Sequence, residues 1–349
     1  MSPTETSASP TEYRALFESA ALREESDRSV IRIEGDQAEE MLHGLVTNRV
    51  KGMQAHRAVY AFMLTPKARL VAALRLLRLD GGYWLDLPAL CQEAVLAHLR
   101  KYLPPIFATF EPTDIHRIGV LGPLAAPALD AWAGEPISLD LAALETRPLE
   151  RGDGASILVR REDVEGTGYD VHVAGHAFQG VVAALEEAIV TIGGRVVGRE
   201  TWEVFRVERG IPVWDTDFDQ DNLAQELGQD ERAISFDKGC YTGQEVVARI
   251  HFRGHVNRNL RGFRLPRPVE PGQPLYEGER ERGAITSPAM SPRLGPIALG
   301  YARFEVPPGA WLSLEPGGQT EVEVVALPFE GPAAPPTAPS SAPPREEPR

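Results

Sequence analysis

Residues 238–245 carry the strongest signal in this chain and read Lys238-Gly239-Cys240-Tyr241-Thr242-Gly243-Gln244-Glu245. A lysine, a thiol, an aromatic ring and an amide–carboxylate pair lie within eight residues that two glycines punctuate. Glycine is used where the backbone bends tightly or approaches a ligand closely. Side chains this varied pack poorly into a hydrophobic core, so we interpret the octapeptide as part of a functional site. Gly239, Gly243 and Glu245 are expected to shape its loop.

The thiol of Cys240 is open to three interpretations: a reactive group, a metal ligand or an inert packed side chain. We favour a functional thiol, because Lys238 lies two residues away and a nearby cation lowers the pKa of a thiol. The chain has two cysteines and no Cys-x-x-Cys pair, so we expect no stably bound metal. A single thiol can still hold a labile ligand together with a partner protein. Cys91, in a predicted helix, is expected to pack as a small apolar side chain.

A basic block follows the octapeptide. Arg249, His251, Arg253 and His255 alternate, which would place all four on one face if the segment were a strand. No Asp or Glu occurs between Val246 and Val269. The block is compatible with a charged edge strand, with a site for carboxylates or phosphates, or with RNA. Few aromatic residues are interleaved in it, so the RNA signal is weak.

An acidic series precedes the octapeptide. It has the alternation of a calcium loop but carries Gln220 where that loop needs glycine, so we interpret it as a solvated loop: Asp215, Asp217, Asp219 and Asp221. Glu226 differs, because it lies among apolar residues. A partly buried carboxylate can accept two hydrogen bonds from the edge of an amidine-like heterocycle such as a pterin.

Composition limits the class of protein. The chain has 349 residues, a formal charge of −14 and a pI near 5.1, which favours two or three domains and argues against a general nucleic-acid-coating protein. No apolar run is long enough to span a bilayer, so no membrane contact is expected. Met1–Pro10 lacks the pattern of a secretory signal, and two cysteines suit a reducing compartment. We therefore expect a cytoplasmic protein.

The coarse pattern is mixed α and β. A strand, a glycine and a helix follow one another three times, at residues 30–46, 118–132 and 169–192. Leu70–Leu79 and Tyr83–Leu87 are predicted strands, and residues 89–102 and 200–209 predicted helices. Asp36 is expected to cap the first helix, with Glu39 at its N3 position. After about residue 260, short β-prone runs alternate with Gly and Pro, as in a small barrel. Residues 1–12 and 331–349 are expected to be disordered.

The octapeptide closely resembles the K-G-C-[aromatic]-x-G-Q-E signature of the YgfZ family. These proteins are folate-binding relatives of the glycine-cleavage T protein and are implicated in iron–sulfur cluster assembly or repair. Four further segments resemble the family in the right order: Leu45-Val46-Thr47-Asn48, Phe62–Lys67, Arg206–Pro212 and the Gly283–Gly300 pattern G-x-x-T-S…S-P…I-A-L-G. The resemblance covers roughly residues 15–330.

The resemblance implies an α+β fold with duplicated ferredoxin-like folate-binding units over 13–257, divided near 115, and a C-terminal β-barrel over 258–330. It implies a tetrahydrofolate cofactor, or another reduced folate, with Glu226 anchoring the pterin and Arg249 facing the folate carboxylate. Asn48, Tyr241 and Gln244 are expected to join that site. Cys240 and Lys238 would carry the chemistry. The implied partners are iron–sulfur client enzymes, including those that thiolate tRNA, or cluster carriers.

One departure separates this chain from the aminomethyltransferases. Their catalytic aspartate corresponds to Ala72 and Ala73 here, and alanine can neither accept a proton nor stabilise a developing positive charge. We therefore do not expect aminomethyl transfer, and leave open whether the protein is an enzyme. Two alternatives remain: a folate-dependent one-carbon transferase or demethylase, and an RNA-binding module that uses the basic block at 249–267.

Overall fold

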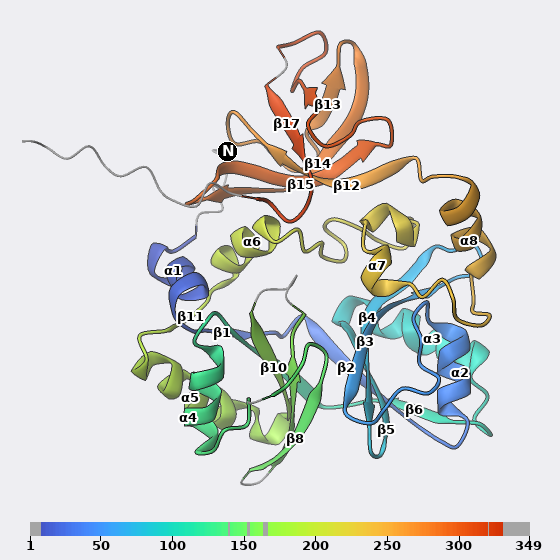
Figure 1. Ribbon diagram of the computed structural model, residues 1–349, viewed down its shortest axis with the longest axis vertical. Helices are drawn as coiled ribbons and strands as arrows, with labels where there is room; N and C mark the ends of the chain where they lie inside the picture. Colours follow the sequence, from blue (N-terminus) through green and yellow to red (C-terminus); the bar gives the residue numbers. More distant parts are fainter. Residues whose placement is uncertain (1–7, 139, 152–153, 163–166, 320, 331–349) are drawn as a thin grey trace, which may run out of the picture.

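The structure is a computed structural model that describes residues 8–138, 140–151, 154–162, 167–319 and 321–330. Its strands form three sheets, which build two α/β units and a barrel (Figure 1). No helix in these ranges is long and apolar enough to cross a membrane. The predicted disorder of 331–349 and 1–7 falls outside the described residues. The same prediction for 8–12 is wrong, because helix α1 (Pro10–Glu18) begins there and Ala8 is buried.

The first unit is a five-stranded antiparallel sheet with the strand order β3-β4-β5-β2-β6. Its elements are β2 (Arg28–Glu34), α2 (Ala38–Leu45), β3 (Arg57–Leu64), β4 (Leu70–Leu79), β5 (Gly82–Pro88), the 3-10 turn η1 (Ala89–Cys91), α3 (Gln92–Tyr102) and β6 (Thr109–Pro112). Apolar side chains of α2 and α3 pack on one face of this sheet, and Cys91 is buried among them, as expected. Burial raises the pKa of the Cys91 thiol to about 12, which keeps it protonated and inert.

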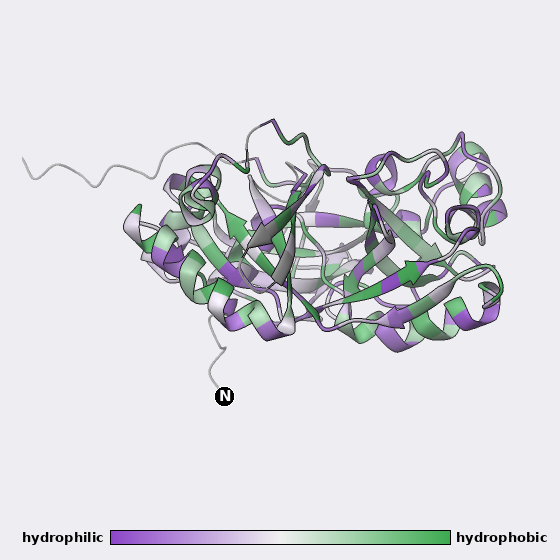
Figure 2. Cartoon of the chain, turned by 90° about the horizontal axis from the view of Figure 1, so that it is seen from below, coloured by the Kyte–Doolittle hydropathy of each residue, from purple (hydrophilic) through white to green (hydrophobic). Residues whose placement is uncertain are grey.

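The second unit has a six-stranded sheet with the order β11-β1-β7-β10-β9-β8. Its elements are β1 (Ala21–Glu24), β7 (Ile115–Leu121), α4 (Ala125–Ala133), β8 (Thr146–Arg151), β9 (Gly154–Arg160), β10 (Gly168–Ala174), α5 (Gly175–Thr191), β11 (Arg195–Val196) and α6 (Arg199–Glu208). Strand β1 pairs with β7, although the whole first unit lies between them in the sequence. Figure 2 shows the two units side by side, with hydrophobic segments along their strands.

A connecting segment then runs from the second unit to the barrel through η3 (Ala224–Leu227), α7 (Asp230–Ala233) and α8 (Gln244–Arg253). The barrel strands are β12 (Arg258–Arg264), β13 (Pro274–Glu277), β14 (Arg280–Ser291), β15 (Gly295–Arg303), β16 (Trp311–Leu312) and β17 (Val322–Val325). A bridge between Tyr276 and Ser313 brings the first and last strands of this sheet together, so the barrel is nearly closed. The predicted α+β fold with a C-terminal barrel is confirmed.

Helix α2 starts later than predicted. Its N-cap is Gln37, which makes no side-chain cap bond, so Asp36 does not cap it. A turn closed by the Ala38 N–H and the Gly35 carbonyl precedes the helix instead. Gly35 has a φ of 142°, and a Cβ there would lie 2.6 Å from backbone atoms of residues 107 and 108. The close chain crossing therefore decides where the helix begins.

A buried ionic network joins the two α/β units. Asp170 of β10 accepts hydrogen bonds from Arg75 of β4 at 2.5 Å and from Arg161 at 2.7 Å. Asp86 of β5 accepts one from Arg117 of β7 at 2.6 Å. Each of these five side chains is almost fully buried. Since breaking one buried pair leaves its partner's charge uncompensated, the network holds the two sheets in one relative orientation.

The network predicts acid sensitivity. Glu25 belongs to the same network, because it accepts hydrogen bonds from Arg117 and Arg161. Nearby arginines outweigh the opposing effect of burial and lower the pKa of Glu25 to about 2, and they hold the pKa of Asp86 well below its usual range. Unfolded carboxylates titrate near pH 4, so this stability is complete above about pH 4.5 and is lost as pH falls toward about 2. The urea midpoint measured against pH should fall steeply over this interval. A flat profile from about pH 5 to about pH 3 would contradict the prediction.

A second buried cluster clamps α6 to the barrel. Arg206 donates to Asp217 at 2.8 Å and to Ser287 of β14 at 2.8 Å. Glu208 accepts from Tyr13 at 2.7 Å and from Ser291 at 2.5 Å. Asp217 is only 4% exposed, so the interpretation of the whole acidic series as a solvated loop was wrong at this position.

Candidate functional site

The octapeptide loop is pinned to the C-terminal end of α2. The ammonium of Lys238 donates to the carbonyl oxygens of His43, Val46 and Asn48 at 2.5, 2.6 and 3.0 Å. The Thr242 N–H donates to the carbonyl of Gly44 at 3.0 Å. Carbonyls in the last turn of a helix lack intrahelical partners, and a cation there is also favoured by the helix dipole. Lys238 and Thr242, from a distant part of the chain, therefore supply hydrogen-bond donors to carbonyl oxygens at this end of α2.

The environment of Lys238 shifts its titration. Burial and, secondarily, the Arg49 guanidinium lower the pKa of Lys238 to about 7. Its ring neighbour is Tyr241, whose centroid lies 4.8 Å from Nζ. The three carbonyl oxygens favour the ammonium form, since a neutral amine has too few protons to donate to all of them. The N–H donors of Lys238 point at α2 and not at Cys240, so the role of Lys238 beside the thiol stays a prediction.

Cys240 lies on the outside of this loop, between its two anchors. The side chain is exposed, and within the described part of the chain its sulfur makes no hydrogen bond. Tyr241, the next residue, points the other way and is buried in the cluster where β3, β4, η3, α8 and the barrel meet. Burial raises the pKa of Tyr241 to about 12, so its hydroxyl stays protonated. The thiol of Cys240 therefore faces solvent, while the side chains of Lys238 and Tyr241 on either side of it are buried.

Gly243 closes the loop and starts α8. Its φ of 86° is in the left-handed region, and a Cβ there would lie 2.8 Å from the carbonyl oxygen of Thr65. Only glycine meets both demands, because the loop rests directly on the turn between β3 and β4. Gly239 is different, since an added Cβ would meet only His43 Nε2, at 3.9 Å. Gln244 and Glu245 form the first turn of α8, where Glu245 is exposed.

Asn48 links the segment after α2 to β3 and α7 through hydrogen bonds of its side chain. Its amide donates to the carbonyls of Tyr60 and Arg232, both at 2.9 Å, and its oxygen accepts from the Arg49 N–H at 2.8 Å. Both amide protons are therefore used within the protein. This leaves only the second lone pair of the oxygen for a cofactor, and the binding role of Asn48 stays a prediction.

Glu226 lies in η3, 6% exposed, beside the barrel. Its Oε2 accepts from Asn222 at 2.8 Å and from Arg258 of β12 at 3.1 Å. Asn222 also donates to the hydroxyl of Tyr301 at 3.1 Å, and the Arg258 guanidinium lies 4.5 Å from the Tyr301 ring centroid. In the described residues, Oε1 of Glu226 accepts no hydrogen bond, so one carboxylate oxygen is available to a ligand.

The sequence did not single out Asn222, Arg258 or Tyr301 as partners of Glu226. The four-residue spacing of Asn222 and Glu226 was the one visible signal. Arg258 and Tyr301 come from barrel strands, and their contact with η3 depends on how the barrel packs.

The segment 249–255, whose alternating residues would share one face in a strand, is a helix, α8, up to Arg253. Residues two apart on a helix point in nearly opposite directions, so the alternating side chains do not share one face. Arg249 is exposed and is not bonded to Glu226. The structure thus brings Lys238, Tyr241 and Asn48 together at α2, and places Glu226 with Arg258 in a separate group.

Ala72 and Ala73 lie on β4 and point to opposite faces of the sheet. Ala72 is fully buried against the helices of the first unit, whereas Ala73 belongs to the cluster that contains Tyr241 and Tyr301. Of the two positions, only Ala73 faces the junction between the two α/β units and the barrel, and its side chain is apolar. No acid or base is available on this strand.

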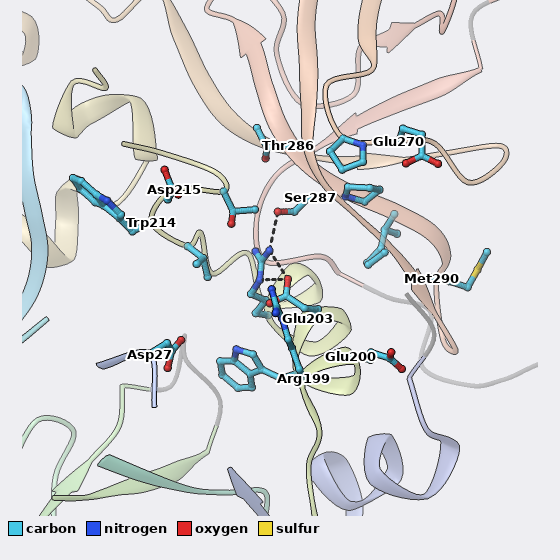
Figure 3. A pocket seen from close by; sticks show the side chains of 18 of the residues that line it. Asp27, Arg199, Glu200, Glu203, Trp214, Asp215, Glu270, Thr286, Ser287 and Met290 are labelled. Carbon is cyan, nitrogen blue, oxygen red and sulfur yellow. Dashed lines mark hydrogen bonds and ion pairs between the residues drawn. The ribbon is translucent and has the colours of Figure 1, made fainter. Parts of the chain in front are cut away.

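A cavity of about 1010 Å³ opens between α6, the 213–216 loop, the β1–β2 turn and the barrel (Figure 3). Trp214 and Asp215 lie on one side of it, and Thr286 and Met290 of β14 on the other. None of the predicted cofactor-binding residues lines it. Around the cavity and elsewhere in the described chain, no three His, Cys, Asp or Glu side chains are grouped to hold a metal ion.

Comparison with known proteins assigns the family. The model of the GCVT N-terminal domain matches residues 3–238, more than half of the chain, and that of the glycine cleavage T-protein C-terminal barrel domain matches residues 258–330. The chain belongs to the glycine-cleavage T-protein family.

Its T-protein fold is shared with a solved relative. The aminomethyltransferase T of the glycine cleavage system from Bartonella henselae superposes with a TM-score of 0.82 at 21% identity, covering 91% of this chain and 88% of that one.

Sequence relatives within the family are named as aminomethyltransferases, as tRNA-modifying proteins YgfZ and, in one case, as a putative transferase. An aminomethyltransferase of Halothermothrix orenii is 26% identical over 342 residues, covering 91% of this chain and 90% of its own length. A tRNA-modifying protein YgfZ of Klebsiella pneumoniae is 30% identical over 243 residues, covering 67% and 68%. The chain spans 63% of the length of a chloroplastic relative from Arabidopsis thaliana, at 26% identity.

Proposed function

We propose that this T-protein family member binds a reduced folate, most simply tetrahydrofolate, and supports the assembly or repair of iron–sulfur clusters in client enzymes of the cytoplasm. Enzymes that thiolate tRNA are among the proposed clients. Cys240 is the proposed functional thiol. The observation that carries the proposal is the combination of an exposed thiol on an anchored loop with an apolar residue, Ala73, facing the domain junction.

The loop geometry supports a working thiol. Buried contacts of Lys238, Tyr241 and Gly243 determine the path of the backbone on both sides of Cys240. The thiol itself makes no hydrogen bond to any residue that the structure describes and is open to solvent. A reactive or ligating cysteine must be accessible yet held in place, whereas a structural cysteine is buried, as Cys91 is.

The group around Glu226 fits the edge of a pterin. A carboxylate with one bonded and one open oxygen can accept a hydrogen bond from a ring N–H, and Arg258 orients it by donating to Oε2. Aromatic side chains of the same junction cluster, Tyr301 and Trp214, offer flat apolar surface. When bound, the folate would supply one-carbon chemistry or act as a structural ligand, and the residues named here would orient it.

Folate binding is tested by thermal unfolding. Tetrahydrofolate at about 100 times its Kd should stabilise the protein by about 2.7 kcal/mol and raise its melting temperature, because the ligand binds only the folded state. Glu226→Gln should erase the shift, and Glu231→Gln, an exposed carboxylate of α7, should keep it. A wild-type protein that responds to no reduced folate would refute the folate site.

The second candidate function is one-carbon transfer, which the names of the aminomethyltransferase relatives favour. Against it stands β4, which offers no carboxylate at the junction. The two functions are separated by a coupled glycine-cleavage assay in which this protein replaces the T protein. We expect no turnover, and sustained aminomethyl transfer would favour the second candidate.

A further inference from the structure

The surface at the C-terminal end of α8 carries exposed rings and cations that neither the thiol nor the folate role uses. We call it the α8 surface, and its exposed members are Arg249, His251, Phe252, Arg253, His255 and Phe304. The half-buried Phe236 joins it by stacking on His251. Phe252 is 68% exposed and Phe304 is 44% exposed. A cluster of exposed aromatic side chains generally marks a binding surface, whereas single exposed apolar residues need no explanation.

The rings are ordered as two flat stacks. Phe236 lies on His251 with centroids 3.7 Å apart and planes at 18°, and Phe252 stands edge-on to His251 at 4.7 Å. His255 lies on Phe304 with centroids 3.9 Å apart and planes at 8°. The Phe304 N–H donates to the Asn257 carbonyl, which places this stack at the start of β12, after the short link 254–257 that follows α8. One stack therefore lies at each end of the link between α8 and the barrel.

The charge of this surface contrasts with that of the chain. Arg249 and Arg253 are exposed, lie four residues apart on one face of α8, and pair with no carboxylate of the described residues. The acidic side chains near the surface rings are Asp237, which pairs with Arg49 at 3.2 Å, Glu305, which follows Phe304, and the half-buried Asp230, whose charge interacts with His251. In a chain with a net charge of −14, two free guanidinium groups beside open rings form a local anion-attracting surface.

Flat exposed rings with adjacent guanidinium groups match unpaired nucleotides. A base stacks on a ring face whatever its identity, and the phosphates pair with arginine. An acidic protein partner would use the cations but would have no need of flat stacks. RNA is recognised mainly at loops, where bases are splayed out and can stack on aromatic side chains and guanidinium planes.

We propose that the α8 surface binds the unpaired nucleotides of an RNA loop. Bases stack on Phe252 and on the His255–Phe304 pair, and Arg249 and Arg253 contact phosphates. The surface is joined to the octapeptide by α8 itself, which begins at Gln244, the residue after Gly243. An RNA loop bound to this surface would therefore lie on the helix that directly follows the Cys240 loop of the protein. The inference does not depend on the chemistry of Cys240 or on folate.

The test uses the purified full chain and a fluorescently labelled RNA hairpin with a single-stranded loop, followed by anisotropy. Phe252→Ala should raise Kd by about tenfold, since stacking one base on one ring is worth about 1–3 kcal/mol. Arg249→Ala with Arg253→Ala should reduce the slope of log K against log salt by about 1.4, or about 0.7 for each phosphate contact. Both variants change exposed side chains, so their melting temperatures should match the wild type.

Matched controls are Ile106→Ala, an apolar side chain that is 85% exposed, and Arg100→Ala, an exposed arginine of α3. Both should bind the hairpin like the wild type, and so should Cys240→Ala, which separates this inference from the thiol proposal. The inference is overturned if Phe252→Ala binds within twofold of the wild type, or if a blunt RNA duplex binds as tightly as the hairpin. Tighter binding of labelled polyglutamate than of the hairpin would assign the surface to an acidic protein and overturn it as well.

Discussion

Cys240→Ala is expected to abolish the support of iron–sulfur enzymes while leaving the fold intact. The side chain is exposed and makes no internal hydrogen bond in the described structure, so its loss should change the free energy of unfolding by no more than about 0.5 kcal/mol. The thiol is the only soft metal ligand among residues 238–245. The effect is measured by complementing a strain that lacks the homologue of this protein and assaying the activity of its iron–sulfur enzymes.

The second cysteine supplies the control. Cys91→Ala removes a buried sulfur from the core of the first unit and should cost about 1–2 kcal/mol of stability without removing activity. The two variants thus predict opposite outcomes: lost function with retained stability for Cys240, and retained function with lost stability for Cys91. Full complementation by Cys240→Ala would end the thiol hypothesis, whatever its melting temperature.

Asp170→Ala is expected to give the largest loss of stability, about 3–5 kcal/mol. The carboxylate is fully buried and accepts hydrogen bonds from Arg75 at 2.5 Å and Arg161 at 2.7 Å. Its removal leaves two buried guanidinium groups without this counter-charge at the interface of the two α/β units. The midpoint of urea unfolding measures the loss. In the same variant, the stability that is lost on acidification should be smaller than in the wild type.

An exposed ion pair is the control for this effect. Arg14 and Glu18 of α1 lie 3.8 Å apart, with side chains 70% and 68% exposed. Glu18→Ala should cost about 0.5 kcal/mol or less, because solvent screens surface pairs. A loss below about 1 kcal/mol for Asp170→Ala would show that the network relaxes around the missing charge and does not hold the units together.

Local patterns in the sequence predicted much of the fold. Strand β4 and helices α4 and α6 were expected within a residue or so of where they lie, because long apolar periodicity reports burial directly. Helix α8 was missed because its alternating Arg and His residues imitate a strand. Its start depends on Gly243 resting on the β3–β4 turn, a contact between segments that are distant in the sequence.

The site was predicted unevenly for the same reason. Cys240, Lys238 and Glu226 were identified because unusual residue types stand out in a linear motif. What Lys238 contacts was not predictable, since the carbonyls it satisfies belong to residues 43–48, about two hundred positions away. The scarcity of aromatic residues in the basic block was misleading as well, because Phe236 and Phe304 reach the α8 surface from outside that block.

By itself, the sequence determined the identity of the reactive groups, the apolar residues at 72 and 73, and the order of the α/β units and barrel, because side-chain chemistry and periodicity are local properties. Only the tertiary structure decided which charges face one another. It assigned Lys238 to the end of α2, Arg258 to Glu226, and the ring stacks to one surface beside two exposed arginines. These pairings depend on packing between distant segments, which no local pattern records.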